Sequence, residues 1–381
     1  MGKKIIAAAD LHLDSTMVGH WDAKAGMHGN WVESFARLDD VVRVCNEESA
    51  DLLVIAGDLF HTGRPSAEAV AMAMERFNKL ETAKVVITNG NHDQTSVVSN
   101  HRTPIDAYIG SQPFCFHAAG ATEYVEHDGL LLGLVPWHRV AGSKSLNQTS
   151  DVLREGVQHL ADEISDQGKP SLLFGHFTVD EATFSSGMRS SELLMSTSVL
   201  EATIPTQQLL DGPWSLARAG HIHKRQDMYI GSTYKVSFAE AEEDKGVELI
   251  DIDDDGKILE HRFIKFDVRE LVKIDLTQGS DLLYNTSDLL KERDVLKLIL
   301  EADQTLTKKT DKVIEDLRKR GVEVQTRRNP RERKIVINKR VAIDTDPRRA
   351  MEIYVNSHVE DPEERRKMMD AFGDVYEGAE L

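Results

Sequence analysis

Five short polar motifs, built from aspartate, histidine and asparagine, each follow an apolar run in this 381-residue chain. Carboxylate, imidazole and amide donors without a thiolate suit Mn²⁺, Fe²⁺ or Zn²⁺ better than a structural zinc finger. A carboxylate in the middle of such a set can bridge two cations, an arrangement that activates water and stabilises charge on a phosphoryl group. We therefore predict a centre for two divalent cations. The motifs are Asp10-Leu11-His12, Gly57-Asp58-Leu59-Phe60-His61, Asn89-Gly90-Asn91-His92-Asp93, Gly175-His176 and Gly220-His221-Ile222-His223.

The spacing within these motifs supports a shared site. Asp10 and His12 are two residues apart, so an extended backbone points both side chains the same way, and His221 and His223 repeat that spacing. Asp-x-His alone is a weak signal, and His176 alone could be a core histidine with a satisfied hydrogen bond. The run Asn-Gly-Asn-His-Asp is a strong signal, because it gathers polar groups where packing gains nothing. All five motifs in this order favour the metal centre.

The elements around the motifs indicate a layered α/β fold. Short apolar runs predict buried strands, and amphipathic stretches at Ser66 to Leu80 and Ser150 to Ile164 predict helices. In the first helix Ser66 is the expected cap, and one apolar face is formed by Ala67, Val70, Ala71, Met74 and Phe77. Each motif then lies at the carboxyl end of a strand, where α/β sheets gather ligands. The predicted strands are Lys3 to Ala9, Leu52 to Ala56, Lys84 to Thr88, Leu130 to Val135, Ser171 to Phe174, Met228 to Ile230, Val247 to Ile252 and Leu259 to Phe263.

Composition points to a soluble cytoplasmic protein. Hydrophobic residues make up 40% of the chain and charged residues 29%. No stretch approaches the roughly 20 apolar residues needed to cross a bilayer. The apolar run after Lys4 is read as a strand and not as a signal peptide. The two cysteines, Cys45 and Cys115, are expected to be packing residues in a reducing compartment.

The charge is unevenly distributed. A formal net charge of −18 by itself opposes nucleic-acid binding, because an acidic surface repels phosphates. Residues 305 to 340, however, hold thirteen Lys or Arg against five Asp or Glu. This basic block predicts a localised electrostatic footprint, with a solvated helix face as the open alternative.

Three domains are predicted. Residues 1–265 form the metal-binding domain. Residues 268–340 restart the α/β pattern on a smaller scale, with strands at 271–276, 295–300, 322–325 and 334–337, a helix at 306–319 closed by Gly321, and the basic block. Residues 341–381 read as two short helices with too few apolar residues for a core of their own. This tail is a candidate docking segment for a partner.

The motifs resemble those of the calcineurin-like metallophosphoesterase superfamily. More narrowly, the stretches Gly57 to Ser66, Tyr229 to Thr233 and Lys245 to Val247 are similar to the SbcD nuclease branch, and the Gly-Asp-x-Val-Asp-Arg-Gly of protein phosphatases is absent. The resemblance implies a four-layer α/β/β/α sandwich with a smaller α/β capping domain and a helical tail. It covers residues 1 to 265.

The resemblance also implies a role for each matched position. Asp10, His12, Asp58 and His223 would hold one cation, and Asp58, Asn91, His176 and His221 the other. His92 would contact the scissile phosphate or the leaving oxygen, with Asp93 orienting it, and His61 would help to position the phosphate. Mn²⁺ is the expected metal, with Mg²⁺, Fe²⁺ or Zn²⁺ as alternatives.

The function implied is a DNA nuclease. Its expected activities are 3′-to-5′ exonuclease action on double-stranded ends and endonuclease action on hairpins and single strands. Expected partners are an SbcC-like coiled-coil ATPase of the ABC type and a second copy of the chain, with no membrane, in a bacterial cell or a phage-infected host. Two rivals stay open: a small-molecule phosphodiesterase or phosphatase on the same scaffold, and a non-catalytic scaffold, which should have lost metal ligands.

Overall fold

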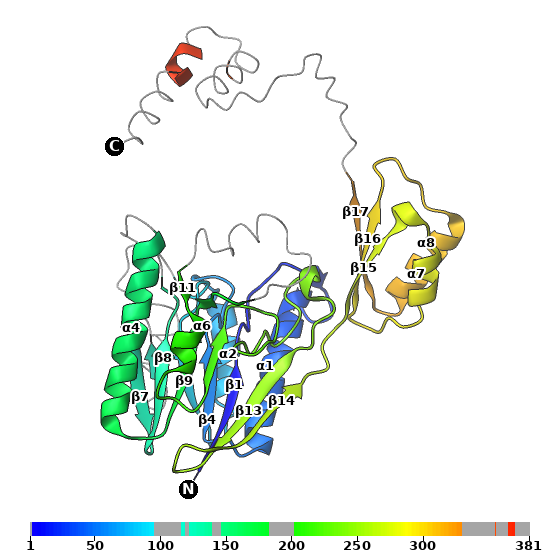
Figure 1. The fold of residues 1–381 in the computed structure, drawn as a ribbon. Coiled ribbons are helices and arrows are strands. Elements are labelled where there is room, and N and C mark those ends of the chain that lie inside the picture. Colours follow the sequence, from blue (N-terminus) through cyan, green and yellow to red (C-terminus); the bar gives the residue numbers. More distant parts are fainter. Residues whose placement is uncertain are drawn as a thin grey trace. The chain divides into compact units, whose positions relative to one another are not determined.

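Two sheets packed face to face carry the polar motifs (Figure 1). The computed structural model describes residues 2–94, 116–118, 122–138, 146–182, 202–329, 355 and 365–369, with the backbone alone at 116–118 and 146–149. Residues Met1–Asn329 form one compact unit.

The first sheet has six strands in the order β14-β13-β1-β4-β5-β6. Strands β1, β4, β5 and β6 run parallel, whereas β13 and β14 are antiparallel to their neighbours. The carboxyl ends of the parallel strands therefore lie at one edge, as predicted. The strands are β1 Lys3–Ala8, β4 Leu52–Ala56, β5 Lys84–Thr88, β6 Phe116–Ala118, β13 Gly246–Ile252 and β14 Ile258–Lys265.

The second sheet has four strands in the order β12-β9-β8-β7. Strands β12, β9 and β8 are parallel, and β7 pairs antiparallel with β8. Two-stranded pairs flank the sheets: β2 with β3, and β10 with β11. The strands are β7 Glu123–His127, β8 Leu130–Val135, β9 Ser171–His176, β12 Ala217–Gly220, β2 Trp21–Asp22, β3 Met27–His28, β10 Thr178–Val179 and β11 Thr203–Ile204.

Strand alternation creates three apolar layers between four layers of elements. On β4, Leu52 and Val54 face the layer between the sheets, while Leu53 and Ile55 face the helices outside. On β8, Leu132 faces inward in the same way. Because every buried strand alternates like this, both faces of each sheet are covered, and the predicted α/β/β/α sandwich is confirmed.

The outer layers are helical. Helix α1 Gly29–Glu47 and helix α2 Ala67–Phe77 cover the first sheet, and α4 Leu146–Gln167 covers the second, with the short α6 Thr206–Leu210 beside it. Helix α1 was not predicted. It starts after His28, whose ring accepts from the Asn30 N–H, so the usual Ser, Thr or Asp cap signal is missing.

The predicted face of α2 is partly wrong. Ser66 caps the helix as expected by accepting from the Ala69 N–H. The buried side chains are Ala69, Ala73 and Phe77, whereas Ala67 and Ala71 are exposed. Phe77 is common to both faces, and Val70 and Met74 are partly buried against the core, so the buried side is turned part of the way around the helix from the predicted one.

A third sheet with its own core follows. Strands β15 Leu271–Asp275, β16 Val295–Leu300 and β17 Glu323–Arg328 are parallel. Helices α7 Asp281–Thr286 and α8 Lys308–Lys319 pack against them, and Gly321 closes α8 at φ 83°, a left-handed value that suits glycine. Short 3₁₀ turns lie at η1 Phe238–Glu240 and η2 Leu276–Gln278.

One predicted strand is absent from the named elements, and other predicted features lie outside the described residues. The Met228 to Ile230 segment makes single bridges and no named strand. The predicted 334–337 strand, Cys115 and most of the 341–381 tail lie outside the described residues. Cys45 is buried, and burial raises the pKa of its thiol to about 12, as expected of a packing residue. No helix in the described segments is long and apolar enough to span a membrane.

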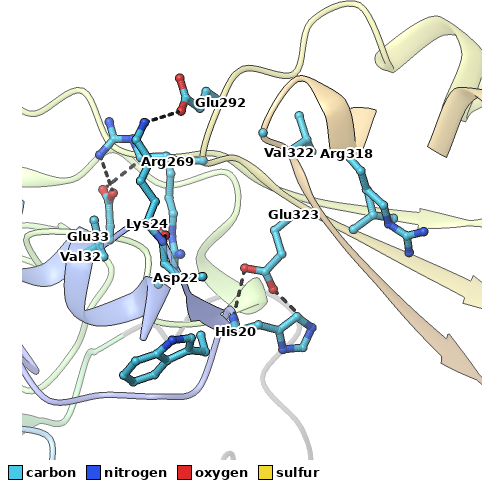
Figure 2. A pocket seen from close by; sticks show the side chains of 16 residues that line it. His20, Asp22, Lys24, Val32, Glu33, Arg269, Glu292, Arg318, Val322 and Glu323 are labelled. Carbon is cyan, nitrogen blue, oxygen red and sulfur yellow. Dashed lines mark hydrogen bonds and ion pairs between the residues drawn. The ribbon is translucent and has the colours of Figure 1, made fainter. Parts of the chain in front are cut away.

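A pocket of about 720 Å³ lies between the β2–β3 hairpin and the third sheet (Figure 2). Polar contacts join its two sides: His20 Nε2 lies 3.6 Å from Glu323 Oε1, and Glu33 forms an ion pair with Arg293 at 3.7 Å. Four acidic side chains and four Lys or Arg side chains line it, so the lining favours neither anions nor cations. None of the predicted site residues lines it.

Candidate metal centre

The structure brings all seven predicted metal ligands to one edge of the two sheets. They follow or end β1, β4, β5, β9 and β12, so five distant chain segments converge. Three groups of described side chains have donor atoms within 4.8 Å of one another and could hold a metal ion. The groups are Asp10, His12 and His223; Asp10, Asp58 and His176; and His12, His61 and His92.

Four of the predicted ligands have strained backbones. Asp10, His12, Asp58 and His221 all have positive φ values, between 42° and 89°. Residues other than glycine rarely adopt this region, which costs on the order of 1–3 kcal/mol each. Backbone hydrogen bonds hold two of them: Asp10 N–H donates to the Gly57 carbonyl and His12 N–H to the Asp58 carbonyl. Strain concentrated on these positions indicates a functional site and could not be read from the sequence.

The first donor set surrounds His12. Its Nε2 lies 3.0 Å from His223 Nε2 and 3.6 Å from Asp58 Oδ2. Asp10, which is fully buried, completes the group. Asp10, Asp58 and His12 are each at most 1% exposed as whole residues.

The second donor set surrounds Asn91. Its Oδ1 lies 3.0 Å from His176 Nε2 and 3.1 Å from His221 Nδ1. The same His176 Nε2 is 3.4 Å from Asp58 Oδ2. One oxygen of Asp58 therefore faces donors of both sets, the position expected of a bridging ligand.

The positions of the hydrogens on the imidazole rings favour bound cations. His176 Nδ1 lies 2.9 Å from the Ala56 carbonyl and has to donate to it, so in the neutral ring Nε2 carries the lone pair and faces the Asp58 and Asn91 oxygens. His223 Nδ1 is likewise bound to Glu240, and its Nε2 then directs a lone pair at His12 Nε2. Lone pairs that converge on lone pairs repel unless a proton or a cation lies between them, so this donor set suits divalent metals.

The pKa of His176 also favours a bound cation. Burial opposes ionisation of His176, but the carboxylates of Asp58 and Asp10 outweigh it and raise the pKa of this imidazole to about 9. A divalent cation would take the place of that proton, because metal binding and protonation compete for one lone pair.

The three predicted catalytic residues also lie here. The His61 and His92 rings stack at 4.8 Å, and His61 Nδ1 is 3.2 Å from His12 Nδ1. Burial, together with His92, lowers the pKa of His61 to about 4, so this ring is neutral near pH 7.

The contacts of Asp93 differ from the predicted orienting contact with His92. Asp93 accepts from the backbone N–H groups of Asp58, Phe60 and Gly90 and therefore braces the loops of the metal motifs. The His92 ring is held instead by the His61 carbonyl, 2.7 Å from its Nδ1. Burial and the neighbouring Asp58 raise the pKa of Asp93 to about 6.

Two further residues support the site and were not predicted. Asp14 accepts from the His61 N–H, and Glu240 lies 3.0 Å from His223 Nδ1. Glu240 belongs to a capping box with Ser237. The Ser-x-x-Glu spacing of such a box was visible in the sequence, although not its contact with a ligand.

Comparison with known proteins agrees with this geometry. Residues 3–225 match the family described as calcineurin-like phosphoesterase, which is more than half of the chain. The chain belongs to this family. The calcineurin-like phosphoesterase fold and the resemblance predicted from the motifs are thus confirmed.

Individual relatives give a narrower likeness. The phosphoesterase is 24% identical over 269 residues to the SbcD component of the nuclease SbcCD from Staphylococcus epidermidis, with 66% of each chain covered. It is 38% identical over 87 residues to the DNA double-strand break repair protein Mre11 of Methanopyrus kandleri, covering 22% of this chain and 18% of that one. The match spans less than two thirds of either relative. Among solved structures, a dimetal phosphatase from Danio rerio aligns with a TM-score of 0.40 at 14% identity, over 70% of this chain and 99% of that one.

Replacing Gly57 by alanine should disrupt the second donor set. A Cβ at Gly57 would lie 2.2 Å from His176 Nδ1, so the ring has to move. We expect turnover of a phosphodiester to fall by about 10²-fold or more, because misplacement by about 1 Å is that costly. Metal content per chain and turnover of bis(4-nitrophenyl) phosphate would measure the effect.

Gly129→Ala is the matched control. Gly129 also has a positive φ, of 89°, but a Cβ there meets nothing within 4 Å. Both variants carry the same kind of backbone strain. Equal losses of activity in the two variants would contradict a specific effect on His176.

Proposed function

We propose that this phosphoesterase is a two-metal DNA phosphodiesterase, a nuclease similar to SbcD and Mre11. The observation that carries the proposal is the position of Asp58 Oδ2, 3.6 Å from His12 Nε2 and 3.4 Å from His176 Nε2. Two nitrogen and oxygen donor sets that share one carboxylate are the arrangement of two-metal phosphoryl-transfer sites.

The proposed ligands divide as the resemblance to the family implied. Asp10, His12, Asp58 and His223 would hold one cation, and Asp58, Asn91, His176 and His221 the other. Bound divalent cations, for which Mn²⁺ is our first choice, supply Lewis-acid stabilisation and a stronger water nucleophile.

His61 and His92 have separate proposed tasks. The neutral His61 ring shares one hydrogen with His12 across the 3.2 Å contact of their Nδ1 atoms. If His12 donates that hydrogen, His61 carries its own on Nε2 and can donate it to a phosphate oxygen. His92 Nδ1 is hydrogen-bonded to the His61 carbonyl. Its Nε2 is therefore the atom able to give a proton to the leaving oxygen.

DNA as the substrate rests on the two relatives and on the basic block. Three cations of the block make contacts within the chain. Arg320 donates to the Ser287 carbonyl, Arg328 donates to the Gln304 carbonyl, and Lys319 pairs with Glu315. These contacts lie within the helices and loops around the third sheet. The electrostatic footprint is therefore assigned to the other exposed cations of the block, Arg327 among them.

The proposed assembly includes an SbcC-like ATPase that binds residues 341–381 and a second copy that meets the α2 region. Domain limits of 1–265, 268–340 and 341–381 are part of this proposal, as is action in the cytoplasm. Loss of ATPase co-purification on deleting 341–381, with nuclease activity retained, would support the docking role, and retained co-purification would refute it.

Cleavage of end-labelled DNA tests the function directly. With Mn²⁺ present, the purified chain should degrade duplex ends and open hairpins, while Asp58→Ala should be inactive because both donor sets lose their shared oxygen. Hydrolysis of nucleotide diesters that DNA neither competes with nor replaces would favour the small-molecule enzyme instead.

His92→Gln should separate chemistry from metal binding. The His92 N–H, which donates to Asp58 Oδ1, remains in the variant, so both donor sets should persist. Loss of a general acid lowers turnover by about 10²- to 10⁴-fold. Metal content and turnover are measured on the same sample, and a variant that loses its metals would contradict the assigned role.

Reversing charge in the basic block should weaken DNA binding. Replacing Arg327, Arg331 and Arg333 by glutamate should flatten the dependence of log affinity on log salt by up to about 3, since each phosphate contact contributes close to one. A control with Lys79, Lys169 and Lys257 replaced by glutamate has the same change in net charge on exposed positions elsewhere. Equal loss of DNA affinity in both variants would refute a localised footprint.

A further inference from the structure

A buried ion pair lies directly behind the first donor set. Glu240 is 3% exposed and Lys245 is fully buried, and Glu240 Oε2 lies 2.7 Å from Lys245 Nζ. Removing two charges from water is costly unless both are paired and hydrogen-bonded. The position of this pair therefore calls for an explanation beyond packing.

The pair contacts one predicted ligand in two places. Glu240 Oε1 lies 3.0 Å from His223 Nδ1, and Lys245 Nζ donates to the His223 backbone carbonyl at 3.0 Å. The ring and the backbone of His223 are thus both held by the same ion pair. His223 Nε2, on the opposite side of the ring, faces His12 Nε2.

Glu240 itself has little freedom to turn. Val236 and Ser237 donate their backbone N–H groups to its two oxygens, each at 3.2 Å. These partners are donors, as is the Lys245 ammonium, so the carboxylate acts as an acceptor on every side. The hydrogen between Glu240 and His223 consequently belongs to His223 Nδ1, and the lone pair belongs to Nε2.

We propose that Glu240 is a positioning residue that fixes the His223 ring and its tautomer for one cation, with Lys245 holding Glu240 and the His223 backbone in register. This inference rests on the proposed metal-binding function. It also makes the two metal positions unequal, because His176 in the second set is oriented by the neutral Ala56 carbonyl. A carboxylate partner increases the donor strength of an imidazole more than a carbonyl does.

Glu240→Gln tests the proposal. Its amide has to direct an NH₂ group either at His223 Nδ1 or at the Lys245 ammonium. We expect one of two Mn²⁺ ions to bind about 10- to 100-fold more weakly, the range for loss of such partners, with the other ion unaffected. Equilibrium dialysis with Mn²⁺ gives both affinities. The nitrogen-15 spectrum of the Zn²⁺-loaded, histidine-labelled protein should lose one Nδ1–H signal, which a merely structural role would not change.

Glu243→Gln is the matched control. Glu243 Oε2 lies 3.0 Å from the same Lys245 Nζ, so this variant removes an equal charge from the same cluster and leaves the Glu240 contact with His223 intact. Both Mn²⁺ affinities should stay at the wild-type value. Equal weakening in the two variants would overturn the proposal, because charge alone would then account for it.

A double variant guards against a failure to fold. Glu240→Gln with Lys245→Met removes both charges, leaves no unpaired ammonium in the core and should show the same selective loss of one ion. Two ions bound at wild-type affinity by a folded Glu240 variant would overturn the inference while leaving the proposed function standing. A wild-type chain that binds no Mn²⁺ would overturn both.

Discussion

The buried carboxylate of Asp58 is the group on which the site depends. The Asp58 side chain is 2% exposed, and a charge so far from water has to be compensated at each oxygen. Oδ1 accepts from the His92 N–H, whereas Oδ2 faces imidazoles from two other strands. Its own N–H donates to Asp93. Because these partners come from separate strand ends, their convergence requires both sheets to be packed in register.

The sandwich supplies that register. Period-two alternation places aliphatic side chains on both faces of β1, β4, β8 and β9, so neither sheet can slide by one residue without turning a buried face outward. The strain at the ligand positions is held by this packing. Backbone hydrogen bonds between neighbouring strand ends, such as Asp10 to Gly57, keep the left-handed residues in place.

The features predicted from the sequence are those that depend on local patterns of residues. Buried strands such as Leu52–Ala56 and Lys84–Thr88 were predicted to the residue, because short apolar runs bounded by polar motifs have few other interpretations. The motifs of the proposed donor sets were recognised for the same reason, and the structure brings them together. The features that were missed depend on contacts between distant segments: the buried side of α2, the partners of Asp93, and the pairing of Glu240 with His223. A count of charges likewise could not predict that Arg320 and Arg328 donate hydrogen bonds to backbone carbonyls of the same chain.

The order of segments along the chain has a consequence for biosynthesis. Strand β1, which leads into Asp10, pairs on one side with β4 and on the other with β13, so that Ile5 meets both Leu52 and Ile250. During translation the first carboxylates therefore emerge long before His221, His223 and the strand that completes their sheet. Contacts so distant in sequence form slowly, since loop closure has to precede them. A nascent chain that ends before His221 would expose one unpaired edge of β1 together with a metal cluster that lacks His221 and His223. The site thus becomes competent only near the end of synthesis of this domain.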